Sequence, residues 1–181
     1  KNTEVFVSPE SKKKIDELFD KYGMADTKPK VLINPGASYG SSKFWTAEGF
    51  AETAKLLQKK LDCHVMLVTG PEEKDLAKKI VDAANGSIVN LSQDNISLEL
   101  LKALVEKSSL LITVDSGPRH LAVALNKPVV VVMGPTDPRY TQTKQEIGRV
   151  VRTAVDCAPC HLKVCPTDHR CMTQIKPQKV A

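Results

Sequence analysis

The sequence predicts an α/β domain with a doubly wound parallel sheet, and three observations support this. Short, β-branched and almost continuously apolar runs alternate along the chain with longer runs in which apolar residues recur every three or four positions. The first kind is typical of strands covered on both faces, and the second of helices that pack on a core. Their alternation implies parallel strands joined by right-handed helical crossovers. The length, 181 residues, suits one core of ordinary size.

The elements follow in order along the chain. Residues 1–30 are expected to lead into the domain with a strand-like piece (residues 5–7), a charged helix (about 9–22) and a turn. Five strands are then expected at residues 31–34, 64–70, 87–91, 110–115 and 128–134. Helices are expected at residues 46–61 and 72–84, after a Ser97 cap, and after Gly117.

Three of these helices carry an apolar stripe that should face the sheet. The stripes are Phe50, Ala54, Leu57 and Leu61 in the first, Leu76, Ile80 and Ala83 or Ala84 in the second, and Leu98, Leu101, Leu104 and Val105 in the third. The pattern predicts a Rossmann-like domain over residues 31–150. A Cys-rich tail over residues 151–181 follows it.

Charge and composition narrow the class of partner. The net charge is +5, which favours anionic ligands or an anionic membrane surface. Aromatic residues make up only 4%, too few for stacking single strands, so no nucleic-acid partner is expected. The chain has no run of 18 apolar residues and no signal peptide, so a cytoplasmic protein is expected. The missing starting methionine suggests a piece of a longer protein, with processing as the alternative explanation.

The candidate site lies in the loops that follow the strands, because open parallel sheets bind ligands beyond the carboxyl ends of their strands. Ser116 and Gly117 open a helix whose unpaired amides suit a phosphate, and Lys43 can neutralise a second phosphate charge. Asp115 would bind a hydroxyl or hold the loop; alternatively, Asp115 and Ser116 simply cap the helix. Neither GxGxxG nor the P-loop pattern occurs, so a dehydrogenase or P-loop ATPase is not expected.

Several of these loops together resemble a known family. NPGASYGSSKFW, TGPEE and residues 96–138 resemble the carboxyl-terminal half of the lipopolysaccharide heptosyltransferases, enzymes of GT-B architecture. DSGPRH is similar to the family pattern Asp-Ser/Thr-Gly-x-x-His, and Lys43, Phe44 and Trp45 are similar to its Lys-x-Trp. The resemblance covers about residues 31–140 and continues into the tail.

The resemblance implies the donor-binding half of an inverting glycosyltransferase that moves heptose or a related sugar from an ADP-sugar to an acceptor of the lipopolysaccharide-core type. It also implies a role for each matching residue. At the diphosphate, Ser38 and Lys43 approach the phosphates, Ser116 and Gly117 offer their amides, and His120 meets the diphosphate or steadies the loop. Asp115 approaches the sugar hydroxyls, Ile96 packs on the adenine, and Glu72 or Glu73 holds the ribose. Lys43 is the candidate catalytic residue, because breaking the anomeric bond leaves extra negative charge on ADP. No cofactor is required for this step.

The residues that bind and activate the acceptor are expected to lie in an amino-terminal domain that this chain does not contain. An inverting transfer needs a general base on the acceptor hydroxyl, and the family carries it in an amino-terminal domain that residues 1–30 cannot build. The chain alone is therefore expected to bind the donor but to be inactive. A lipid-linked acceptor would place the enzyme at the inner face of the cytoplasmic membrane.

Arg119, inside DSGPRH, is expected to reach a phosphate. Two alternative functions to the glycosyltransferase are an adenine-nucleotide-binding module and a zinc-tailed nucleic-acid binder, both without catalysis.

The tail concentrates cysteines. Cys157, Cys160, Cys165 and Cys171 are spaced C-x2-C-x4-C-x5-C, with histidines between them. Such thiols suit a structural zinc ion. Iron–sulfur ligation, two disulfides and reduced structural thiols are the competing interpretations, and a cytosolic setting disfavours stable disulfides.

Overall fold

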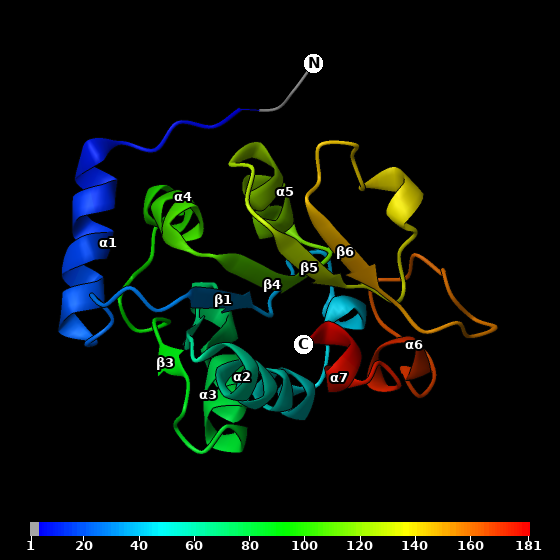
Figure 1. The fold of residues 1–181 in the computed structure, drawn as a ribbon. Coiled ribbons are helices and arrows are strands. Elements are labelled where there is room, and N and C mark those ends of the chain that lie inside the picture. The colour runs from blue at the N-terminus through cyan, green and yellow to red at the C-terminus, as the bar shows by residue number, and fades with distance from the viewer. Residues whose placement is uncertain (1–3) are drawn as a thin grey trace.

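The predicted parallel sheet is confirmed in a computed structural model, which describes residues 4–181. Its six strands run in the order β3-β2-β1-β4-β5-β6, all pairs parallel (Figure 1). The strands are β1 (Lys30–Asn34), β2 (His64–Leu67), β3 (Val89–Asn90), β4 (Leu110–Val114), β5 (Val129–Val132) and β6 (Gly148–Val151). The order reverses between β1 and β4, so the loops after these two strands face the crevice in which doubly wound sheets bind ligands.

Helices cover both faces of the sheet. On one face lie α1 (Pro9–Lys21), α4 (Leu98–Lys107) and α5 (Gly117–Ala124); on the other lie α2 (Ala47–Leu61), α3 (Lys74–Ala83) and α7 (Pro177–Val180) (Figure 1). Alternate strand residues serve the two layers: Val31 and Ile33 join the core under α2 and α3, whereas Leu32 joins the core under α1 and α4. The Ser97 cap is confirmed, since its hydroxyl accepts from the Leu100 amide at 3.3 Å.

The apolar stripes are confirmed except at helix ends. Phe50, Ala54 and Leu57 are buried. Leu61 and Leu98 are 50% and 66% exposed, because one is the last residue of α2 and the other the first of α4, past the part of each helix that packs on the sheet.

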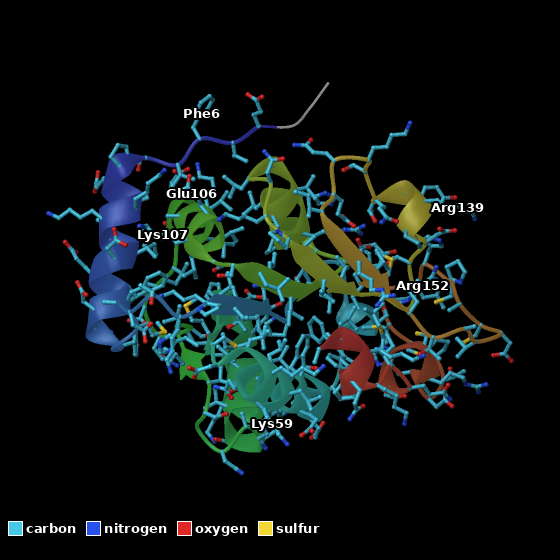
Figure 2. The ribbon with its side chains drawn as sticks, viewed as in Figure 1. Phe6, Lys59, Glu106, Lys107, Arg139 and Arg152 are labelled. Atoms are coloured by element: carbon cyan, nitrogen blue, oxygen red, sulfur yellow. The ribbon has the colours of Figure 1, made fainter. Side chains whose placement is uncertain are left out.

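The expected strand at residues 5–7 is wrong. Residues 4–8 have no regular structure and join no strand of the sheet, and Phe6 is 85% exposed. Figure 2 shows Phe6 on the segment that runs outside the helices. The predicted helix is confirmed as α1, which packs on α4 with two ion pairs, Lys12–Glu106 at 2.9 Å and Lys107–Asp16 at 2.7 Å. The first three residues of the expected lead-in lie outside the described residues.

The cysteine-rich tail packs into the domain. Cys171, Met172, Ile175 and Val180 are buried in the core under α2. Strand β6 and two short helices, α6 (Arg170–Thr173) and α7, occupy a region in which the sequence pattern predicted little regular structure. Among the described residues, none of the helices combines the length and apolar character needed to cross a membrane.

Candidate functional site

The candidate site is a cleft at the carboxyl ends of β1, β2 and β4. Its larger part, about 740 Å³, is lined by the loops after these strands and by Ile96. A smaller cavity of about 220 Å³ shares Ala37, Ser38, Ser116 and Gly117 with it, so the two are neighbouring parts of one site. Every predicted donor-binding residue lines one part or both: Glu72, Glu73 and Ile96 the larger; Lys43, Asp115 and His120 the smaller; Ser38, Ser116 and Gly117 both.

Lys43 lines the smaller cavity and is held there by Asp115. It ends a short 3-10 turn, Ser41–Lys43, in the loop after β1. Its Nζ donates to Oδ2 of Asp115 at 2.8 Å and to the Asp115 carbonyl at 2.7 Å, and lies 4.7 Å from the centre of the Tyr39 ring. The side chains of Lys43 and Asp115 are 11% and 4% exposed. The ammonium is therefore held by Asp115 and largely removed from water.

Asp115 binds donors from three elements. Besides Lys43, the Thr136 hydroxyl donates to Oδ2 at 2.8 Å and Arg119 Nη1 to Oδ1 at 3.0 Å. Burial by itself raises the pKa of Asp115, but the hydrogen bonds from Lys43 and Thr136 and the charge of Lys43 outweigh it, so this pKa lies below its ordinary value. The carboxylate therefore stays ionised near neutral pH and ties the loops after β1, β4 and β5 together.

The interpretation of Asp115 and Ser116 as simple caps is wrong. Ser116 occupies the N-cap of α5, yet its side chain makes no capping hydrogen bond and its Oγ instead lies 3.1 Å from the Thr113 hydroxyl. The carboxylate of Asp115 is turned to Lys43, Thr136 and Arg119. The first turn of α5 thus presents backbone amides to the cleft without a side-chain cap, an arrangement that suits an anion.

Arg119 does not reach the cleft, contrary to the prediction. Its side chain is 0% exposed and donates through Nε and Nη2 to both carboxylate oxygens of Glu146, at 2.7 and 3.2 Å. Nη1 donates to Asp115 and, at 2.8 Å, to the Thr141 hydroxyl. Arg119 lies in the first turn of α5, four positions after Asp115, and its guanidinium is buried against Asp115 and Glu146.

In the larger part of the cleft, Glu72 and Glu73 differ in exposure and in their contacts. The Glu73 carboxylate accepts from the Gly70 amide at 3.1 Å and lies against Gly36, where even a Cβ would overlap it. Glu72 is exposed. Glu73 therefore points across the cleft between the loops after β1 and β2, and Gly36 is required for that close approach.

The sequence interpretation missed several residues that line the site. Tyr39 and Thr141 line the smaller cavity, and Phe44, Thr69 and Leu101 line the larger. Tyr39 could have been found, because it shares a loop with Ser38 and Lys43. Thr141 lies in an irregular segment that no local pattern connects to the site.

The predicted zinc site is not supported. Within residues 4–181, no three His, Cys, Asp or Glu side chains are arranged to hold a metal ion. The four tail cysteines line one small cavity of about 100 Å³ and are not disulfide-bonded. Cys157 and Cys160 are exposed, whereas Cys171 is packed in the core, where burial and then the neighbouring cysteines raise the pKa of its thiol.

Taken together, fold and site define a Rossmann-like α/β domain with a cleft at its topological switch point, lined by a mostly buried lysine and by the uncapped first turn of a helix. The family model for glycosyltransferase family 9 (heptosyltransferase) matches residues 2–170. The chain belongs to this family.

Curated relatives and solved structures similar to this chain include heptosyltransferases. The chain is 35% identical over 159 residues to lipooligosaccharide heptosyltransferase 2 of Campylobacter jejuni, covering 83% of this chain and 49% of that protein. It is 28% identical over 170 residues to lipopolysaccharide heptosyltransferase 2 of Escherichia coli K12, covering 89% and 47%. The solved structure of the E. coli ADP-heptose heptosyltransferase II matches with a TM-score of 0.78 and 25% identity, over 98% of this chain and 50% of that one. The chain thus spans about half the length of these relatives.

Proposed function

We propose that the chain is the donor-binding part of a glycosyltransferase that moves heptose, or a related sugar, from an ADP-sugar to a lipopolysaccharide-core-type acceptor. The observation that carries the proposal is the buried Lys43 ammonium, fixed by Asp115 beside the uncapped amides of Ser116 and Gly117, where the two parts of the cleft meet. The acceptor would be lipid-linked and would hold the enzyme at the inner face of the cytoplasmic membrane. Co-sedimentation with anionic vesicles tests that location.

The cleft accommodates the parts of such a donor in order. The larger part takes the adenosine, with Ile96 against the adenine and Glu73 accepting from the ribose hydroxyls. The diphosphate lies at the junction, near Ser38, Lys43 and the amides that open α5. The sugar then occupies the smaller cavity, which Asp115, His120 and Thr141 line.

The chemistry follows from charge. When the anomeric bond breaks, the departing ADP gains negative charge, and donors already in place stabilise it without reorganising. Lys43 and the α5 amides are such donors, so the proposed transfer requires no bound cofactor. The general base that takes the proton of the acceptor hydroxyl belongs to the part of the enzyme that binds the acceptor.

Nucleotide titration tests the proposal. Calorimetry of the 181-residue chain is expected to show ADP binding at least about tenfold more tightly than UDP or CDP, a difference of about 1.4 kcal/mol. Equal affinities for the three diphosphates would contradict adenine recognition, and no binding of any of them would overturn the proposal.

The ribose contact gives a matched pair of variants. Glu73→Gln is expected to weaken ADP binding about tenfold, because a neutral amide oxygen accepts more weakly than a carboxylate. The change keeps the shape beside Gly36, and the exposed Glu72→Gln is its control, with no change expected. The effect of Glu73→Gln should vanish when 2′,3′-dideoxy-ADP replaces ADP. A larger loss from Glu72→Gln would assign the ribose to the other glutamate.

A further inference from the structure

The tail and the loop that carries Lys43 lie against each other over several hydrogen bonds. The Tyr39 hydroxyl donates to the His161 carbonyl at 2.6 Å. The Ser42 amide donates to the Lys163 carbonyl at 3.0 Å and the Ser42 hydroxyl to the Leu162 carbonyl at 2.5 Å. A Cβ at Gly40 would overlap the Lys163 carbonyl, so glycine is required where the two segments touch. Residues more than 100 positions apart therefore share one rigid contact.

His169 adds one more hydrogen bond between the tail and this loop. Its ring donates from Nε2 to the carbonyl of Ser42 at 2.5 Å. The backbone from which the ring extends is held as well: His169 has a left-handed conformation (φ 59°) at the N-cap of α6, and its carbonyl accepts from the amides of Met172 and Thr173. Ser42 is 1% exposed and immediately precedes Lys43.

We infer that His169 is a positioning residue for Lys43, and that the tail serves the donor site through it. The tail holds the amide, the hydroxyl and the carbonyl of Ser42, which fixes the backbone from which the Lys43 side chain starts. A loop that is already ordered does not have to lose backbone freedom when Lys43 meets an anion, so contacts that hold Ser42 in advance favour binding. This inference rests on the proposed function, since it assumes that Lys43 meets a diphosphate.

The inference predicts different effects on ADP and on the nucleoside adenosine. ADP carries a diphosphate for Lys43 to bind. Adenosine has no phosphate and would occupy the larger part of the cleft, which the tail cysteines and His169 do not line. Loosening the Ser42–Lys43 backbone should therefore weaken ADP binding and leave adenosine binding unchanged. A general loss of structure would weaken both.

The experiment compares His169→Leu with His169→Gln by calorimetric titration of the whole chain with ADP and with adenosine. The Gln side-chain nitrogen reaches about as far as His Nε2 and can donate to the Ser42 carbonyl; Leu cannot. We expect ADP affinity to fall about five- to tenfold in His169→Leu and to recover in His169→Gln, the size expected for one hydrogen bond. Adenosine affinity should stay constant in both.

Folding is checked in the same samples through Trp45, the only tryptophan of the sequence. It is 3% exposed and packs edge-on against Phe50, so unfolding would shift its emission. Should His169→Leu fail to fold, His169→Asn replaces it, because Asn accepts a left-handed backbone but its amide is too short to reach Ser42.

The outcomes separate the inference from the proposed function. Unchanged ADP affinity in the folded Leu or Asn variant, equal losses for ADP and adenosine, or no recovery in His169→Gln would each overturn the positioning role while the donor site stands. If the unmodified chain bound adenosine but not ADP, the proposed function would fail, and the inference with it.

Discussion

Replacing Lys43 with Met is expected to weaken ADP binding by about 10- to 100-fold. A charge-assisted hydrogen bond contributes about 1.5–3 kcal/mol, and each 1.4 kcal/mol is tenfold in affinity. Met keeps the length and apolar stem of Lys43 but removes the ammonium that would meet the diphosphate. Adenosine binding should change little, because Lys43 lines only the smaller part of the cleft. Calorimetric titration with both ligands measures the difference.

The matched control is Lys163→Met. Lys163 Nζ lies 5.9 Å from the same Tyr39 ring that Lys43 contacts, but Lys163 is exposed and lines neither part of the cleft. Its loss should leave ADP binding almost unchanged. Equal effects of the two substitutions would mean that ADP responds only to overall charge, and would remove Lys43 from its proposed catalytic role.

The central part of the fold could be predicted because its signals are local. The β-branched runs at β1, β4 and β5 are covered on both faces, and the helices between them keep their apolar stripe. Strand β6 was missed because its sequence, GRVV, begins with exposed Gly148 and Arg149 at the edge of the sheet. What makes it a strand is pairing with β5, which no short window of sequence reports.

The residues of the site likewise fall into those that a local sequence pattern could place and those that it could not. Lys43, Ser116 and Gly117 could be placed because each follows a predicted strand, and parallel strands bring their carboxyl ends to one edge. The partner of Arg119 could not be placed, since Glu146 lies 27 positions away in a segment without periodicity. The same holds for His169 and Ser42, separated by 127 positions. Only the folded chain brings these pairs together.

The Arg119–Glu146 pair carries the largest expected effect on stability. Both side chains are buried, at 0% and 1% exposure, with two hydrogen bonds between them. Arg119→Met is expected to lower the free energy of unfolding by about 3–5 kcal/mol, because it leaves a buried carboxylate without its counter-charge. Urea denaturation followed by Trp45 fluorescence measures this.

A double-mutant cycle separates the pair from simple loss of packing. Glu146→Gln added to Arg119→Met removes the stranded charge, so the double variant should be more stable than Arg119→Met alone, a sign that two independent changes cannot produce. Arg139→Met is the control, because the Arg139 side chain is 85% exposed, on the outer side of the molecule in Figure 2, and its partner Asp137 keeps the hydrogen bond from the Arg139 backbone amide, so little stability should be lost. Since Arg119 also holds Asp115, ADP affinity should fall in Arg119→Met even where the protein remains folded. Additive losses in the cycle would show that Arg119 acts by filling space and not by pairing with Glu146. Unchanged ADP affinity in a folded Arg119→Met variant would show that Asp115 depends on Lys43 and Thr136 alone.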